Sequence, residues 1–250
     1  MMMRVNTQRG YVMPGLGTII NTAAIVVGGL LGLLFKNLLT KSMEDTLLKA
    51  SSVCVLFIGI GGAMQHMLKI TDGALETSGS MMLIICFVLG SIVGELLDIE
   101  GAFERFGAWL RKKTHNESDT GFLSAFIHAS LTVCIGAMAI VGSIQDGLLG
   151  DSSLLCAKAA LDAVIILVMT ASMGKGSIFS AIPVALLQGG VTLLSRVLAP
   201  VFTEAAIANL SYTGSVMIFC VGLNLVWGKK IKVANLLPTL VFAALYALVF

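Results

Sequence analysis

The segment from Asp151 to Met173 reads DSSLLCAKAALDAVIILVMTASM, a long apolar run with Lys158 and Asp162 inside it. At 3.6 residues per turn these two residues lie on one helix face, one turn apart. If the run crosses a membrane, Asp162 lies about ten residues from its start, at a depth of roughly 15 Å, near the bilayer centre. A charge at that depth costs on the order of 3 kcal/mol on insertion scales, so we expect a polar reason for keeping it.

Two interpretations of this charged pair remain open from the sequence. In the first, Lys158 and Asp162 form a structural ion pair that holds two helices together. In the second, they form a polar point on the path of a solute or an ion.

The composition predicts an all-α, polytopic transmembrane helical bundle. Hydrophobic residues make up 57% of the 250 residues, charged residues only 12%, and the mean hydropathy is +0.95. A soluble domain averages about 25% charged residues, so much of the usual solvated surface is missing. The 27 glycines suit close helix contacts in lipid. The net charge of +2 gives no reason to expect a nucleic-acid partner.

The cysteines give no sign of a metal site, a cofactor or a disulfide. All of them lie within apolar runs and none has metal-ligand spacing, so we interpret them as small apolar residues. They are Cys54, Cys86, Cys134, Cys156 and Cys220.

The chain is predicted to form one transmembrane domain over residues 13–250, after an N-terminal extension at residues 1–12. The string MPGLGTIIN beginning at Met13 resembles a natural start. Eight spans of apolar residues follow. They cover about 16–35, 50–68, 80–97, 122–143, 153–173, 178–197, 212–228 and 234–250.

The basic residues are unevenly distributed among the connections between these spans. Connections after the second, fourth and sixth spans hold only Lys69 and Arg196. Connections after the odd-numbered spans hold Lys36, Lys41, Lys49, Arg105, Arg111, Lys112, Lys113, Lys175, Lys229, Lys230 and Lys232. The positive-inside rule therefore places the odd-numbered connections in the cytoplasm and both termini outside. Two of them, 38–48 and 98–113, are predicted to form amphipathic helices along the interface.

A weak internal repeat is also present. The pairs Gly28/Gly32 and Gly90/Gly94 occur in similar apolar contexts, and 184–190 is a looser third copy. We interpret these as a two-helix unit that recurs three times, with the third copy inverted, although coincidence among Gly-rich helices remains an alternative. Small residues four apart also indicate helix packing, within a subunit or in a homodimer.

Further polar residues lie within or beside the predicted spans. Asn21, Gln188 and Asn224 are amides that either bond across helices or line a cavity. Gln145 and Asp146 lie in a short connection without basic residues, which either forms a turn or provides an acidic vestibule that attracts cations.

Several strings resemble a bacterial membrane family called domain of unknown function 554. They are GTIIN from Gly17, CIGAMAIVGSIQDG from Cys134, and KAALD from Lys158. The resemblance implies an integral protein of the bacterial cytoplasmic membrane. It implies no activity, substrate or cofactor.

We therefore expect a membrane transporter or channel for a small solute or ion, surrounded by lipid. Asp162 would bind a coupling ion or proton, Lys158 would be its counter-ion, and Asn21, Gln188 and Asn224 would supply neutral ligands. No nucleotide-binding Gly-x-x-x-x-Gly-Lys-[Ser/Thr] string is present. An intramembrane enzyme is the alternative, but His-Glu-x-x-His and Gly-x-Ser-x-Gly strings are absent, so we expect no enzyme. A structural or regulatory membrane protein is the third interpretation.

Overall fold

The computed structural model describes residues 14–36, 38, 40–71, 73–117, 119–135, 137–198 and 203–249. The predicted N-terminal extension at residues 1–12 lies outside them. Within the described chain, helices account for nearly all regular structure. The elements are α1 (Leu16–Lys36), α2 (Lys41–Met67), β1 (Leu68–Thr71), β2 (Ala74–Thr77), α3 (Ser80–Leu97), α4 (Ile99–Lys113), α5 (Phe122–Cys134), α6 (Ala137–Leu149), α7 (Ser153–Met173), the 3-10 helix η1 (Lys175–Ser180), α8 (Ala181–Leu193), α9 (Ser195–Leu198), α10 (Glu204–Trp227), the 3-10 helix η2 (Val233–Leu236) and α11 (Pro238–Val249).

The protein is a multi-pass, all-α membrane bundle. Within the described residues, six helices are long and apolar enough to cross a membrane: α1, α2, α3, α7, η1 with α8, and α10. Large apolar side chains point outward along them, including Ile19 on α1, Phe57 on α2 and Val164 on α7. Such a surface would be unfavourable in water, whereas lipid tails solvate it.

Two of the eight predicted spans depart from a simple crossing. The span predicted at 122–143 is broken after α5, and α5 and α6 are bent by 60° relative to each other. If this bent pair is one crossing, the described chain has up to seven candidate spans. The eighth prediction corresponds to α11, which with η2 forms a shorter apolar stretch over Val233–Leu248.

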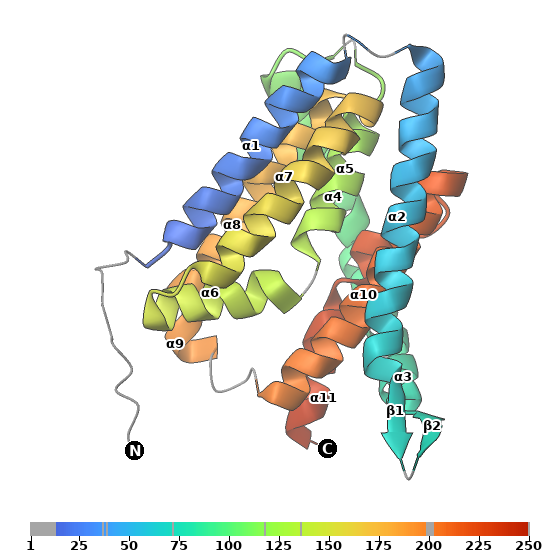
Figure 1. Ribbon diagram of the computed structural model, residues 1–250, viewed down its shortest axis with the longest axis vertical. Helices are drawn as coiled ribbons and strands as arrows, with labels where there is room; N and C mark the ends of the chain where they lie inside the picture. Colours follow the sequence, from blue (N-terminus) through green and yellow to red (C-terminus); the bar gives the residue numbers. More distant parts are fainter. Residues whose placement is uncertain are drawn as a thin grey trace.

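The bundle has two distinct ends (Figure 1). The β1–β2 hairpin lies at one of them and α11 ends near it, so we call it the hairpin end. The opposite end is reached where α1, α7 and α10 finish. We call it the basic end, because Lys36, Lys175 and Lys229 lie at or just beyond those helix ends.

The two connections predicted as interfacial helices behave differently. Residues 98–113 do form a helix, α4, whose first turn is capped by the Asp98 side chain accepting from Gly101 N at 3.2 Å. In contrast, 38–48 is not a separate helix, because α2 begins at Lys41 and runs on without a break to Met67. Thr40 caps α2 by accepting from Met43 N. The β hairpin between α2 and α3 was not predicted.

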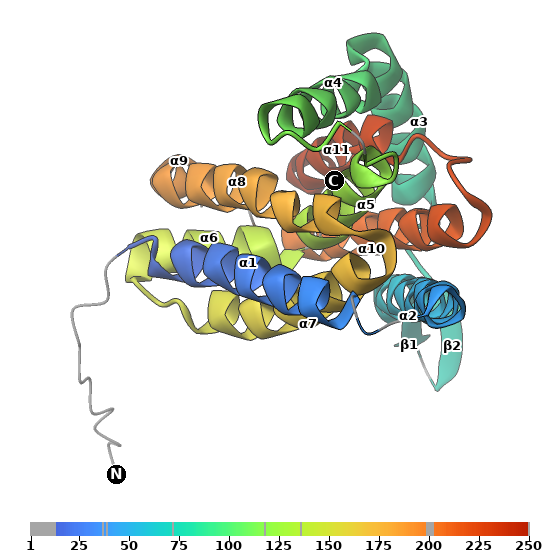
Figure 2. The ribbon, with the colours of Figure 1, turned by 90° about the horizontal axis from the view of Figure 1, so that it is seen from above.

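Glycines allow helices to pack backbone to backbone. Gly28 and Gly32 on α1 face the backbone of α7 at Ala163 and Leu167, and Figures 1 and 2 show α1 and α7 side by side. Similarly, Gly59 on α2 faces the backbone of α10 at Phe219, and Gly94 on α3 faces Asn235 of η2. The glycine spacings thus indicate contacts within one chain, which is the packing interpretation of these motifs.

The close approach of α1 to α7 predicts that a single methyl group there is harmful. In Gly28→Ala the new Cβ would overlap Ala163, so the helices must move apart, at about 1–3 kcal/mol of folding free energy. Gly61→Ala on α2 is the control, because its Cβ would meet no atom within 4 Å. Thermal unfolding in detergent should show a lower Tm for the first variant only, and equal Tm values would contradict this packing.

Candidate functional site

The predicted charged pair is buried at the middle of α7. Asp162 is 3% exposed and Lys158 is 6% exposed, and the Lys158 ammonium donates to Asp162 Oδ2. The same carboxylate oxygen accepts from Asn21 Nδ2 at 3.0 Å, and Asn21 is fully buried on α1. Three of the predicted site residues, Asn21, Lys158 and Asp162, are therefore in direct contact.

The Lys158 ammonium also bonds to the broken helix. It donates to the Val133 carbonyl at 2.8 Å, one residue before α5 ends at Cys134. The last four carbonyls of a helix lack intrahelical partners, and together they form the negative end of the helix dipole. Lys158 thus satisfies a backbone acceptor that the break between α5 and α6 leaves free.

These contacts refine the two interpretations of the pair. Lys158 and Asp162 belong to the same helix, so the ion pair itself does not join two helices. The links between helices come from Asn21 on α1 and Val133 on α5. The pair is consequently both a structural junction of α1, α5 and α7 and a charged point that neighbouring space can reach.

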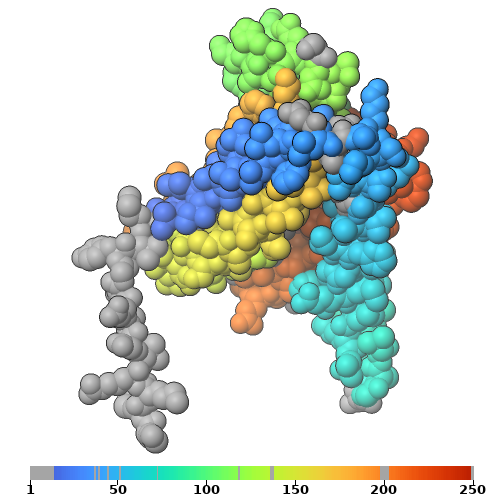
Figure 3. Space-filling view, turned by 45° about the horizontal axis from the view of Figure 1, so that its top comes forward, coloured from blue at the N-terminus to red at the C-terminus, as the bar shows by residue number. Residues whose placement is uncertain are grey.

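That neighbouring space is a cavity of about 550 Å³, which we call the hairpin-end cavity. Its walls come from α2, α7, α10 and both sides of the α5–α6 break, where Ile135 and Met138 line it. Figure 3 shows the surface hollowed between α2 and the α6–α7 region, with α10 behind. Its polar lining residues are Gln65, His66, Thr132, Lys158, Asp162, Ser211 and Ser215. Polar groups at this depth reduce the cost of holding a charge away from bulk water.

Asp146 does not line an open vestibule, as one interpretation expected, nor does it form a turn. It is fully buried within α6, and its Oδ2 accepts from Gly17 N at 3.1 Å. Gly17 lies in the first turn of α1, where backbone N–H groups need acceptors and a negative charge is favourable. Asp146 therefore caps α1 from a distant part of the chain. Gln145 is half-buried beside it and meets the start of α7 through its backbone, where its carbonyl accepts from Asp151 N.

Gln188 is buried on α8 at 1% exposure, and neither of its amide atoms has a hydrogen-bond partner among the described residues. One turn further along, Thr192 lies 3.5 Å from the Thr18 hydroxyl on α1. Asn21 is three residues beyond Thr18, and its Oδ1 is likewise unpartnered in the described chain. An unsatisfied buried group costs about 1–3 kcal/mol. The α1–α8 interface therefore contains hydrogen-bonding groups that could bind a ligand, because they have no partner in the described chain.

Asn224 is not part of the Asp162 group. Its Oδ1 accepts from the backbone N–H groups of Lys230 and Ile231, each at 3.0 Å, and its Nδ2 donates to the Ile231 carbonyl at 2.7 Å. These bonds close the turn after α10 at the basic end. Asn224 thus lies apart from Asp162, and its amide bonds to the backbone of that turn.

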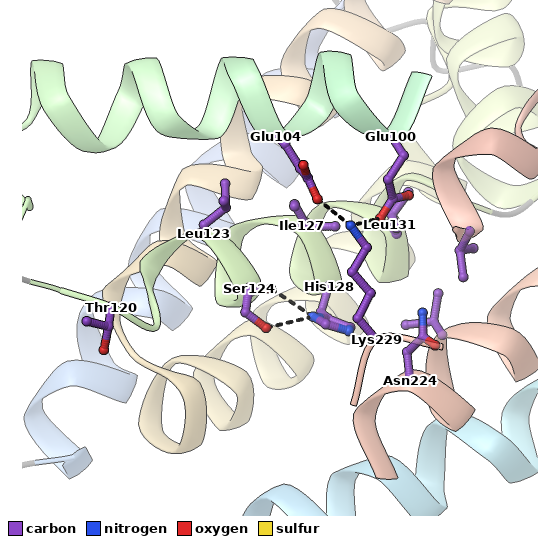
Figure 4. A pocket seen from close by; sticks show the side chains of 12 residues that line it. Glu100, Glu104, Thr120, Leu123, Ser124, Ile127, His128, Leu131, Asn224 and Lys229 are labelled. Atoms are coloured by element: carbon purple, nitrogen blue, oxygen red, sulfur yellow. Dashed lines mark hydrogen bonds and ion pairs between the residues drawn. The ribbon is translucent and has the colours of Figure 1, made fainter. Parts of the chain in front are cut away.

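A second polar cluster was missed by sequence reasoning. Lys229 Nζ contacts Glu100 Oε1 at 3.1 Å and also pairs with Glu104, both on α4 (Figure 4). Glu100 is 5% exposed, and its other oxygen accepts from Ala234 N at 3.0 Å. Burial alone would lower the pKa of Lys229, but its hydrogen bonds to Glu104 and Glu100 outweigh that effect and raise the pKa above its usual value.

These residues line a cavity of about 260 Å³, which we call the basic-end cavity. Thr120, Ser124, His128 and Asn224 are its other polar lining residues, as Figure 4 shows. The amphipathic pattern of α4 gave the only signal. That pattern predicted an interfacial helix. It could not predict that Glu100 contacts Lys229, which lies more than 100 positions away in the sequence.

The comparisons with known proteins identify a family that includes a protein named as a membrane protein. The profile of the family described as "Protein of unknown function (DUF554)" matches residues 16–248. The chain belongs to that family. It is 26% identical to the uncharacterized membrane protein YdfK of Bacillus subtilis (strain 168) over 224 residues, which are 90% of this chain and 92% of YdfK. It is also 25% identical to the uncharacterized protein YqgA of Escherichia coli (strain K12) over 235 residues, covering 91% and 94% of the two chains. No solved structure matches the chain.

Neutralising one member of the buried pair should destabilise the fold more than neutralising both members. Lys158→Met leaves a buried carboxylate with only Asn21 as its partner and removes the donor to Val133, so we expect a loss of about 3–5 kcal/mol. Adding Asp162→Asn removes the unpaired charge and should restore most of the lost stability. The control is Lys49→Met, which breaks an exposed Lys–Asp pair of the same spacing. Thermal unfolding in detergent measures all three, and a double variant as unstable as Lys158→Met would contradict the expectation.

Proposed function

We propose that this protein is a membrane transporter or channel for a small solute or ion, with Asp162, Lys158 and Asn21 at its binding point. The observation that supports this most strongly is the place of the charged pair. It lies at the middle of α7, beside a broken helix, and lines the hairpin-end cavity. A purely structural pair would need no space next to it.

The broken helix gives independent support. In secondary transporters, substrates and coupling ions bind near the bilayer midplane where discontinuous helices expose backbone carbonyls and helix ends. Here α5 ends at Cys134, and the Val133 carbonyl, which has no partner within the helix, accepts a hydrogen bond from Lys158. Irregular backbone at membrane depth is tolerated only where protein or a water-filled cavity surrounds it, and the hairpin-end cavity lies at this break.

Each residue then has a distinct role. Asp162 binds the proton or cation, because it is the carboxylate that lines the hairpin-end cavity. Lys158 is its counter-ion and retains the Val133 carbonyl as a second partner when Asp162 is neutralised. The unpartnered Oδ1 of Asn21 provides a further acceptor beside it. Gln188 remains a candidate ligand through its unused amide.

We further infer that the protein lies in the bacterial cytoplasmic membrane with its basic end in the cytoplasm. The positive-inside rule supports this orientation, and it places the start of α1 and the end of α11 outside. The proposed repeat fits the same picture. The pair α8 and α10 runs in directions opposite to α1 and α2 in Figure 1, as expected for an inverted third copy.

The decisive experiment compares two carboxylates that each pair with a lysine four residues away. Proteoliposomes of the native protein are screened for flux of protons, alkali cations and small metabolites. We expect Asp162→Asn to abolish whatever flux the native protein supports, because the amide cannot carry the charge. Asp45→Asn, at the exposed Asp45–Lys49 pair, should leave that flux unchanged.

Folding must be measured in the same preparations. The amide introduced by Asp162→Asn retains an acceptor oxygen for Lys158 and for Asn21, and the Val133 carbonyl still accepts from Lys158. We therefore expect the variant to elute as native protein in size-exclusion chromatography, with the lower Tm that an unpaired buried ammonium causes. If Asp162→Asn loses folded protein in proportion to flux, the pair is structural. If flux persists with native folding, Asp162 is not the binding residue.

A further inference from the structure

The two cavities are lined by the same face of α5. Ser124 and His128 line the basic-end cavity, and Leu131 is the last residue of α5 that does so. Thr132 and Ile135 then line the hairpin-end cavity. Positions 124, 128 and 131 share one face of α5, and Ile135, in the break just after α5 ends, follows Leu131 by four residues. A single stripe of α5 therefore leads from one cavity to the other.

α10 provides a second stripe. Ser211, Ser215 and Ile218 line the hairpin-end cavity, whereas Val221 and Asn224 line the basic-end cavity. Positions 215, 218, 221 and 224 are each three apart and form a row that winds around the helix by about 60° at each step, so that the hairpin-end cavity and the basic-end cavity meet different sides of α10. Ile218 and Val221 are separated by about 4.5 Å of helix rise, and Leu131 and Thr132 by about 1.5 Å. The cavities thus approach each other within one turn of both helices.

The basic-end lining residues that lie nearest in sequence to the other lining are apolar. Leu131 is 3% exposed and Val221 is fully buried, and both belong to the same core cluster. Each lining is mixed, with apolar residues around a lysine that pairs with one or two carboxylates: Lys158 with Asp162 on one side, and Lys229 with Glu100 and Glu104 on the other. A short apolar constriction between two polar cavities is how many pores are closed, because water leaves such a constriction.

We propose that the basic-end cavity is a second binding site for a small cation, the proton included, and that Leu131 and Val221 form the gate between it and the Asp162 site. This rests on the proposed transport function. In each cavity an incoming cation takes the place of a lysine ammonium at a carboxylate: Asp162 in one cavity, and Glu100 or Glu104 in the other.

His128 belongs to this second site. Its Nδ1 lies 2.8 Å from the Ser124 carbonyl and 3.2 Å from the Ser124 hydroxyl, and in the tautomer that donates to the carbonyl Nδ1 carries the proton. Nε2 is then the ring atom left to accept a proton or a donor within the cavity. His128 stands beside Lys229 and Asn224 in Figure 4, so a proton that passes the gate meets an acceptor on the basic-end side.

The first test measures access from each side of the membrane and needs no transport activity. The five native cysteines are replaced by alanine, and single cysteines are placed at Ser124 and at Ser211. Reconstituted protein is treated with a membrane-impermeant thiol reagent on one side at a time. Thr71→Cys on the hairpin and Lys230→Cys at the basic end report which side is which, because both positions are exposed.

We expect Ser211→Cys to react only from the hairpin side and Ser124→Cys only from the basic side. Ser143→Cys is the matched control, since Ser143 is fully buried on α6 and lines neither cavity. It should stay unmodified from both sides. Labelling of both test positions from one side, or of neither position, would overturn the two-cavity path even if Asp162 proves essential for flux.

The second test opens the gate. The variant Leu131→Ala with Val221→Ala should raise passive flux across proteoliposomes by about tenfold or more, because a wider, wetted constriction no longer excludes ions. Separate arms measure protons with a pH dye and Na⁺ or K⁺ with ion dyes, which distinguishes the species. The control is Ile25→Ala with Ile166→Ala, two fully buried positions on α1 and α7 that line neither cavity. Flux equal to that of the control would show that Leu131 and Val221 are not the gate.

Discussion

The bond from the Lys158 ammonium to the Val133 carbonyl is the contact on which this arrangement depends. A helix that stops within the membrane leaves carbonyls without donors, and lipid cannot supply any. Lys158 supplies one from α7, and Asp162 and Asn21 then balance the charge that this requires. The break in the helix, the buried charges and the hairpin-end cavity therefore occur together, because a backbone carbonyl left free at the end of α5 needs a hydrogen-bond donor.

Glycine residues on α1 make this arrangement of α1 and α7 sterically feasible. Because α1 approaches α7 at Gly28 and Gly32, the Asn21 side chain reaches Asp162 directly. Asp146 contributes at the same interface by capping the first turn of α1 from α6. The charged pair is thus positioned by three segments far apart in the sequence, while the side of the pair toward α2 and α10 borders the cavity.

Sequence patterns predicted what depends on local spacing. Long apolar runs located α1, α3 and α7, and the four-residue spacing of Lys158 and Asp162 predicted that they face the same way. The break after Cys134 was not predicted, because no proline marks it and the apolar run continues through it. The role of Asp146 and the burial of Glu100 were also beyond reach, since each depends on a partner more than 100 residues away. The separation of Asn224 from Asp162 was not predicted either, because the sequence does not show that its amide bonds to the backbone of the turn after α10.

Placing both members of the ion pair on one helix has an electrical consequence. Moving one elementary charge through the full membrane potential involves about 2.3 kcal/mol per 100 mV. Lys158 and Asp162 are one turn apart on α7 and travel together, so their opposite charges cancel and the potential does almost no net work on them. Any voltage dependence of this protein would then come from the species it carries, and the Lys158–Asp162 pair would contribute almost nothing to it.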